Sequence, residues 1–150
     1  MNRFQGDPAI KITKNGARMK FIGGQPIMDM GLDSAAQISL FTDNGYWGNI
    51  LEREESKRIG SDFSQVQKRA IVDIQTINDY TDSVNRAFKW MRETNLAKKI
   101  TVNVSNPRTD YVITRVHIEP PGRDVQELLF LKNGLNWISQ SLNPAHERLE

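Results

Sequence analysis

The residues best suited to chemistry in this sequence are its two histidines, His117 and His146. Neither has a second histidine at the spacing of metal ligands, and the chain contains no cysteine. Zinc, iron–sulfur and thiolate chemistry need such partners. Alternating apolar residues place His117 in the middle of a strand, on the face opposite Val116 and Ile118. We therefore expect no metal site, and we expect His117 to be a partly exposed strand residue.

The other residue types that carry chemistry also lack the required arrangement. The sequence has no Gly-x-Ser-x-Gly turn to activate a serine, and no strand leads into a Gly-x-Gly-x-x-Gly or Walker-type phosphate loop. The acidic residues Glu52, Glu54 and Glu55 lie among arginines and lysines, so no carboxylate pair suited to glycoside hydrolysis is visible. We predict no catalytic residue and no cofactor, and hence a protein that is not an enzyme.

Two large aromatic side chains stand out in an otherwise polar connection. They belong to the segment Tyr46-Trp47-Gly48-Asn49, which falls where loops are usually hydrophilic. Two interpretations of Trp47 are equally open. It anchors in a pocket of a partner protein, or it folds back to seal the core.

Length and composition describe one ordinary domain, expected to span residues 1–148. The chain has 150 residues, of which 38% are hydrophobic and 25% charged, with a formal net charge of +2. This charge implies no nucleic-acid partner. The longest apolar runs are too short to cross a bilayer, and residues 1–7 lack the features of a secretory signal. We expect synthesis in a cytoplasm and no membrane partner, and we interpret Leu149-Glu150 as an expression-tag remnant.

The N-terminal part predicts a β-hairpin followed by a short helix. Residues 9–12 and 17–22 are extended segments separated by an Asn-Gly turn, which supplies the positive φ that tight hairpins need. A compact apolar stretch then predicts a short helix that ends near Phe41 and is capped by Asp33 or Ser34.

The central part predicts two helices, or one helix bent near Thr76 to Asn78. Ser64-Gln65-Val66-Gln67 fits a capping box, so a helix is expected to begin there. Its apolar face would comprise Val66, Ala70, Ile74 and Ile77. A second start signal over Thr76 to Asp79 precedes another apolar stripe, made by Tyr80, Val84, Ala87, Phe88 and Met91. Asn95 is expected to end the helical region in a left-handed conformation.

The C-terminal part changes to the alternating pattern of half-buried strands. Strands are expected at 100–105, 111–119 and 125–132, with turns at 106–110 and 120–122. Consecutive strands joined by short turns pair antiparallel. The predicted fold class is α+β, with an N-terminal β-hairpin and short helix, and two central helices packed on a C-terminal three-stranded antiparallel sheet.

Several motifs follow one another in a recognisable order. They are Gly6-Asp7, residues 24–32, residues 35–41, Tyr46-Trp47-Gly48-Asn49, Ile59-Gly60-Ser61, and the helix-then-strand arrangement of 87–104. None is chemically specific alone. In their order and spacing the chain resembles the Mu-type phage baseplate wedge family, the product of Mu gene forty-six and its prophage relatives, over nearly its whole length.

This resemblance implies a structural component of a contractile phage or prophage tail baseplate, located in the virion tail. Its partners would be other baseplate wedge proteins and tail sheath or tube proteins. The family is similar to the T-even wedge protein once named as a tail lysozyme, so a peptidoglycan-cleaving enzyme is the alternative function. The T-even relatives carry a Glu-Pro-Arg stretch where this chain has Leu96-Ala97-Lys98-Lys99-Ile100.

Assembly would use the aromatic segment and an edge of the sheet. We hypothesise that one strand, 100–105 or 125–132, accepts a strand from a partner protein. The candidate partner-interface residues are Tyr46, Trp47, Asn49, Lys98, Lys99, Ile100, Val102 and Val104.

Overall fold

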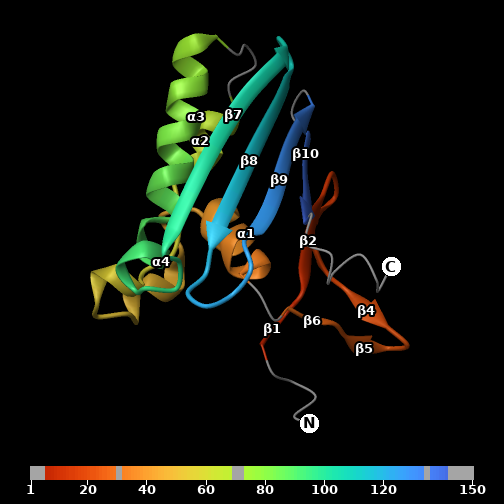
Figure 1. Ribbon diagram of the computed structural model, residues 1–150, viewed down its shortest axis with the longest axis vertical. Coiled ribbons are helices and arrows are strands. Elements are labelled where there is room, and N and C mark those ends of the chain that lie inside the picture. The colour runs from red at the N-terminus through yellow and green to blue at the C-terminus, as the bar shows by residue number, and fades with distance from the viewer. Residues whose placement is uncertain (1–5, 30–31, 69–72, 134–135, 142–150) are drawn as a thin grey trace.

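The protein consists of helices packed on one face of an antiparallel sheet, with a small lobe of short strands beside it (Figure 1). The computed structural model describes residues 6–29, 32–68, 73–133 and 136–141, so the suspected tag residues lie outside the described part. In chain order the elements are β1 (Asp7–Pro8), β2 (Ile10–Thr13), β3 (Gly16–Met19), β4 (Phe21–Ile22), β5 (Gln25–Pro26), β6 (Met28–Asp29), α1 (Asp33–Phe41), the short 3-10 helices η1 (Trp47–Ile50) and η2 (Glu55–Lys57), α2 (Phe63–Gln67), α3 (Ile74–Ala87), α4 (Lys89–Glu93), β7 (Lys99–Arg108), β8 (Tyr111–Glu119), β9 (Gln126–Asn133) and β10 (Asn136–Ser141). The predicted α+β class is confirmed.

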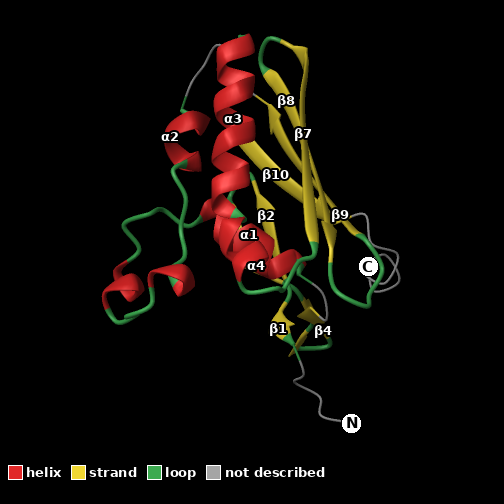
Figure 2. Ribbon diagram, turned by 60° about the vertical axis from the view of Figure 1, so that its left-hand side comes forward, coloured by secondary structure: helices red, strands yellow, loops and turns green. Residues whose placement is uncertain are grey.

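The main sheet has four strands in the order β10-β9-β8-β7, and each neighbouring pair is antiparallel. Strand β8 has the predicted bounds, and β9 begins and ends one residue later than predicted. The expectation of three strands is wrong, because β10 follows β9 and pairs with it. The central helices cover one face of this sheet, as predicted (Figure 2).

The inner faces of β8 and β9 supply much of the core. Their fully buried residues are Val112, Thr114, Val116 and Ile118 in β8, and Leu128, Phe130 and Lys132 in β9. The alternation predicted for β8 is therefore confirmed, and β9 alternates in the same way. Lys132 is the one charged member of this set, and burial lowers the pKa of its ammonium from the ordinary 10.5, against the attraction of Asp110.

Strand β7 is longer than predicted. It continues to Arg108, so the expected turn over residues 106–110 is reduced to Thr109 and Asp110. The pairing with β8 shifts register between Ser105 and Arg108, which marks a bulge near the end of the strand. Pro107 is tolerated here because β7 lies at an edge, where a missing N–H need not break the sheet.

Five aromatic residues from both layers meet at the centre of the core. Phe63 of α2 lies 5.0 Å from Trp137 of β10 and 5.7 Å from Tyr80 of α3, measured between ring centroids. Phe41 of α1 lies 5.9 Å from Phe63 and 5.6 Å from Phe130 of β9. We call these five residues the aromatic cluster. Edge-to-face packing of such rings adds to the stabilisation from their burial.

Helix α2 does not begin as predicted. Its first residue is Phe63 and Asp62 occupies the cap position, so Ser64 lies inside the helix and caps nothing. Of the apolar face expected for this region, Val66 is buried, whereas Ala70 lies outside the described residues.

Helix α3 begins earlier than the predicted start over Thr76 to Asp79, and the region predicted to hold two helices or one bent helix contains three described helices, α2, α3 and α4. Asp73 caps it by accepting a hydrogen bond from the Thr76 N–H at 2.7 Å. Ile74 is 79% exposed, contrary to prediction, because it is about 200° around the helix from the buried Thr76. The second predicted stripe, from Tyr80 to Met91, is buried throughout, and Asn95 has the predicted positive φ, 57°.

Helix α1 begins at Asp33, but neither Asp33 nor Ser34 caps it with its side chain. The carboxylate of Asp29 in β6 instead accepts the Ser34 N–H at 2.6 Å, a position where the helix dipole favours negative charge. The Ser34 hydroxyl accepts the Ile10 N–H at 3.3 Å and donates to the Pro8 carbonyl at 3.2 Å. The start of α1 is therefore built by the N-terminal lobe.

The N-terminal lobe contains the predicted hairpin, in which β2 and β3 pair antiparallel. A polar clasp fastens it to α1 and β10. Within it, the Ile12 N–H donates to Ser139 Oγ at 2.9 Å, and that hydroxyl donates to Gln37 Oε1 at 2.7 Å. Gln37 Nε2 donates to the Ile10 carbonyl at 3.1 Å. Strand β2 thus packs against β10 and covers that side of the sheet (Figure 1).

Candidate functional site

Strand β7 forms an edge of the main sheet, and no described strand pairs with its outer side. Helix α3 packs against β7 and runs beside it (Figure 1), and no described strand pairs with the outer side of β7. In an antiparallel pair, alternate residues point their N–H and C=O groups away from the partner strand, so β7 presents outward backbone groups. Ile100 is buried and Val102 and Val104 are half-buried, while the residues between them are exposed.

The two predicted docking strands have different positions in the sheet. Strand β7 contains the predicted segment 100–105 and is an edge. The alternative, residues 125–132, is wrong because β9 pairs with both β8 and β10 and has no free side. Lys98 and Lys99 are exposed where the chain enters β7.

The predicted aromatic segment lies in a closed loop of residues 43–61, which we call the Trp47 loop. Its neck is a parallel bridge between Asp43 and Ser61. The Ser61 N–H donates to the Thr42 carbonyl at 2.8 Å, and the Ser61 hydroxyl donates to the Leu40 carbonyl at 2.6 Å. The loop therefore leaves and rejoins the domain at one fixed point.

Two residues hold the Trp47 loop in shape. Gly60 has φ 120°, and a Cβ at this position would lie 2.5 Å from the carbonyl oxygen of Asp43, so only glycine fits the neck. Asn49 bridges the loop, because its Nδ2 donates to the Ile59 carbonyl at 2.7 Å and its Oδ1 accepts the Ile59 N–H at 3.0 Å. Asn49 thus positions the loop, and its predicted contact with a partner stays a prediction.

The tip of the Trp47 loop is apolar and exposed. Trp47, Ile50 and Leu51 are 69%, 86% and 78% exposed. The Tyr46 ring lies 5.6 Å from the Trp47 ring and packs over Gly48. The interpretation that Trp47 seals the core is therefore excluded. Sequence reasoning had singled out the aromatic pair, but it missed Ile50 and Leu51, whose apolar character in a polar connection was the available signal.

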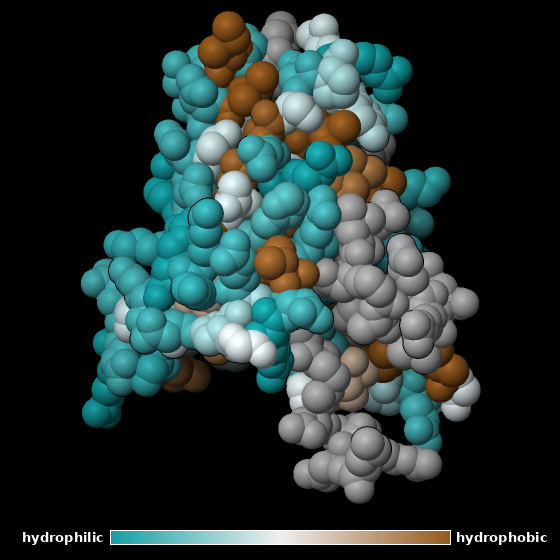
Figure 3. Space-filling model, in the orientation of Figure 1, coloured by the Kyte–Doolittle hydropathy of each residue, from teal (hydrophilic) through white to brown (hydrophobic). Residues whose placement is uncertain are grey.

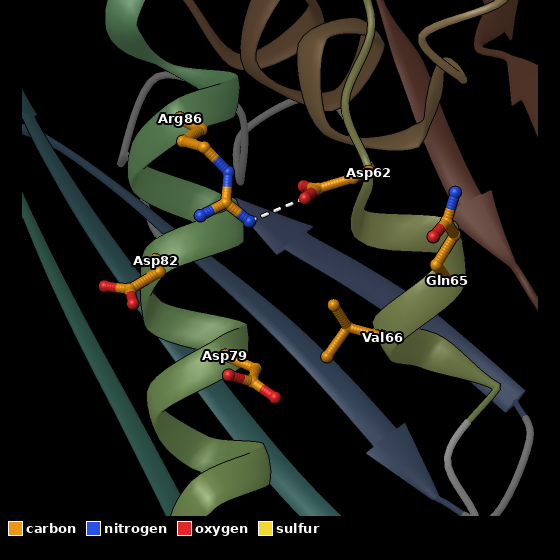
Figure 4. A pocket seen from close by; sticks show the side chains of 6 residues that line it. All are labelled: Asp62, Gln65, Val66, Asp79, Asp82 and Arg86. Carbon is orange, nitrogen blue, oxygen red and sulfur yellow. Dashed lines mark hydrogen bonds and ion pairs between the residues drawn. The ribbon is translucent and has the colours of Figure 1, made fainter.

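A salt-bridged carboxylate joins α2 to α3 beside a surface hollow (Figure 4). Asp62 lies 2.6 Å from the guanidinium of Arg86 and accepts a hydrogen bond from the Ser83 hydroxyl at 2.7 Å. Partial burial acts to raise the pKa of Asp62, but the hydrogen bonds from Ser83 and Arg86 outweigh it and lower the pKa below 3.8. The arrangement is a clamp between helices, and Asp79 and Asp82 of α3 line the same hollow.

We expect Asp62→Asn to destabilise the protein by about 1 kcal/mol at neutral pH. The folded-state pKa is depressed, so the ionised carboxylate stabilises the fold above the unfolded-state value of 3.8 and loses this effect as pH falls through the folded-state pKa. Thermal unfolding between about pH 7 and pH 2 should show the gap between the two proteins closing at the acid end. Glu54→Gln, which removes an exposed ion pair with Lys57, should leave the stability nearly unchanged at every pH. A gap that stays constant with pH would contradict the assignment.

His117 lies on the sheet face opposite Val116 and Ile118, as predicted. Its Nε2 is 3.2 Å from Glu127 Oε1, which is also 3.1 Å from Nε of Arg115. Arg115 and Glu127 thus form a surface ion pair, and the His117 ring lies beside it. Within the described residues, no group of three or more His, Cys, Asp or Glu side chains is placed to hold a metal ion.

The surface on the side seen in Figure 1 is mixed. Hydrophobic residues gather in the upper half of this view, over α3 and the sheet, and are interrupted by hydrophilic ones (Figure 3). Among the described helices, none has the length and apolar character needed to span a membrane.

Comparison with protein-family models, curated proteins and solved structures finds no match in any of the three.

Proposed function

We propose that this protein is a structural assembly domain that joins neighbouring proteins through the open edge formed by β7. One observation carries the proposal, namely the contrast between the two sheet edges. Strand β10 is covered by the N-terminal lobe through the polar clasp, whereas β7 has a free outer side in the described structure. Unpaired strand edges template pairing with other chains, so proteins that do not use them usually cover them.

The middle of β7 is suited to receive a strand. Its regular pairing with β8 runs from Lys99 to Ser105, and the bulge and Pro107 come only at the far end. Backbone hydrogen bonds to an added strand would provide affinity, and side chains beside Val102 and Val104 would extend the buried face. The bulge and Pro107 discourage pairing only at the end of β7, so the stretch from Lys99 to Ser105 remains available to a partner strand.

The Trp47 loop would supply a second contact. It lies at the same end of the molecule as the start of β7, and η2 in the loop contacts α4, which leads towards that strand (Figure 1). Its apolar tip has the residue types that dominate binding energy when they fill a partner's pocket. The closed neck and the Asn49 bridge fix the loop in advance, so binding costs little ordering entropy.

We infer that the assembly is the baseplate of a contractile phage or prophage tail. The resemblance of the sequence to the Mu-type baseplate wedge family supports this finer statement. A baseplate subunit must bind several neighbours at once, and two separate surfaces on a small rigid domain suit that requirement. The partners would be the large wedge protein and the sheath or tube proteins.

Proline substitution in β7 provides the test. Neighbouring residues of a strand point their N–H groups to opposite sides, so of Asn103→Pro and Val104→Pro one removes an outward N–H and the other a bond to β8. We expect the variant that lacks the outward N–H to remain folded. Its co-purification with the co-expressed large wedge protein should fall by at least about tenfold. Arg18→Pro, in the exposed hairpin strand β3, is the matched control and should retain the partner.

Two results would contradict the proposal. One is full retention of the wedge protein by whichever β7 variant keeps the thermal stability of the parent. The other is turnover of purified cell-wall peptidoglycan that a single Glu-to-Gln change abolishes, which would favour the lysozyme-like enzyme instead.

A further inference from the structure

The open edge of β7 carries positive charge at both ends and none of the opposite sign. Lys98 immediately precedes the strand, Lys99 is its first residue and Arg108 its last, and all three are exposed. The strand contains no Asp or Glu. Glu119 stands opposite Lys99 in β8, but no ion pair within 4.0 Å joins them.

These cations differ from others on the sheet in having no carboxylate partner. Arg115 of β8 is 3.1 Å from Glu127 of β9, so the charge on the interior strand is compensated within the sheet. Arg108 stacks over the Tyr111 ring at 5.2 Å, and it has no ion pair within the described structure, nor have Lys98 and Lys99. The edge therefore presents uncompensated positive charge to whatever adds to it.

The same charges oppose pairing between two copies of this chain. Antiparallel pairing of β7 with a second β7 would bring the lysines of one copy towards Arg108 of the other. Parallel pairing would place lysines beside lysines. Like charges directly opposite each other destabilise a strand pair, and lysine on an edge is a common protection against self-association. The occupant of this edge must therefore be a different chain.

We propose that β7 selects an extended segment of another protein that carries Asp or Glu near both ends and uncharged residues between them. This inference rests on the proposed strand docking and specifies the partner's chemistry. The span from Lys99 to Arg108 corresponds to about 30 Å of extended strand, which sets the separation of the acidic residues. Between them, residues from Ile100 to Ser105 carry no charge, and half-buried Val102 and Val104 favour β-branched neighbours.

Three synthetic peptides test this selection. Each matches the 10-residue length of β7 and has the same alternating Thr-Val interior, with glutamate, glutamine or lysine at both ends. Amide chemical shifts of the isotope-labelled full chain locate binding, and titration gives affinity. We expect shifts concentrated in β7, with the glutamate peptide bound about fivefold more tightly than the glutamine peptide at low salt, and a smaller ratio in about 0.5 M salt.

Reversal of the edge charge is the sharper comparison. The triple variant Lys98→Glu, Lys99→Glu, Arg108→Glu should prefer the lysine peptide. The matched control Lys14→Glu, Arg18→Glu, Lys68→Glu makes the same change in net charge at exposed sites away from β7, and should keep the preference for glutamate. A control that switches preference together with the triple variant would overturn the inference, because net charge alone would then explain it.

Other results also decide the matter. Equal binding of all three peptides at β7 overturns charge selection and leaves strand docking intact. No shift at β7 with any peptide, or equal occupation of β7 by a single-stranded DNA oligonucleotide, overturns the inference as well. The proposed function is judged separately by the proline variants and the wedge protein, so the two failures are distinguishable.

Discussion

Truncation of Phe63 to alanine is expected to reduce the free energy of unfolding by about 4 kcal/mol. Phe63 is fully buried and contacts three other rings of the aromatic cluster, Phe41, Tyr80 and Trp137. These rings come from different helices and from the last strand, so the cavity left by truncation cannot be filled by movement of one element. Thermal unfolding should show a midpoint lower by about 12 °C.

Trp47→Ala is the matched control, since it also removes a large ring. Trp47 is 69% exposed, so we expect its loss to change stability by less than about 0.5 kcal/mol. Chemical denaturation of both variants would give the free energies directly. A Phe63→Ala protein as stable as the parent would show that the aromatic cluster is not the centre of the core.

Gly60→Ala is expected to destabilise the protein by about 3 kcal/mol and to open the Trp47 loop. The backbone at Gly60 has φ 120°, which a residue with a side chain rarely adopts, and the added Cβ would meet the Asp43 carbonyl oxygen at 2.5 Å. Either the neck between Asp43 and Ser61 breaks or the strain remains. Faster hydrogen exchange at the Ser61 and Asn44 amides, which close the neck, would report the opening.

Gly45→Ala is the control within the same loop. A Cβ there has no neighbour within 4 Å, and the residue has no positive φ, so alanine should be tolerated. If the Trp47 loop contacts the wedge protein, Gly60→Ala should also weaken co-purification, and Gly45→Ala should not. Equal behaviour of the two variants would show that the neck does not set the shape of the loop.

The helices and strands that could be predicted are those specified by neighbours in sequence. Strand β8 was predicted within its true bounds because its buried residues alternate without interruption from Val112 to Ile118. The region where α1 begins was predicted, but its capping residue was not, because Asp29, which accepts the Ser34 N–H, belongs to another element. Ser34 and Ser64 fit capping patterns in the sequence, but their side chains do not cap α1 or α2 in the structure.

Strand β10 was missed for a related reason. Ser139 is buried, yet its hydroxyl gives no apolar signal in the sequence. Its burial is stabilised by Gln37, which lies 102 positions away, and by the Ile12 N–H. An alternation rule based on hydrophobicity cannot recognise an inward polar residue whose partner is so distant.

The candidate site was predicted in part. The residues of β7 could be found from alternation. The identity of the edge strand could not, because it depends on the order of strands in the sheet. Without β10, residues 125–132 appeared to form an edge just as 100–105 did. The exposure of Trp47 depends on Gly60 and on the Asn49 bridge. Neither residue indicates by its type alone that it holds a loop away from the core.

The polar clasp also constrains the order in which the protein can mature during synthesis. It joins Ile12 to Ser139, residues 127 positions apart, so the N-terminal hairpin cannot reach its final partner until Ser139 has left the ribosome. Until then β9 is itself an uncovered edge, so the nascent sheet has two unpaired edges, β9 and β7, where the folded sheet has one. A chain that terminates before Ser139 should therefore aggregate. In a chain that includes Ser139, β7 is the one uncovered edge of the described sheet.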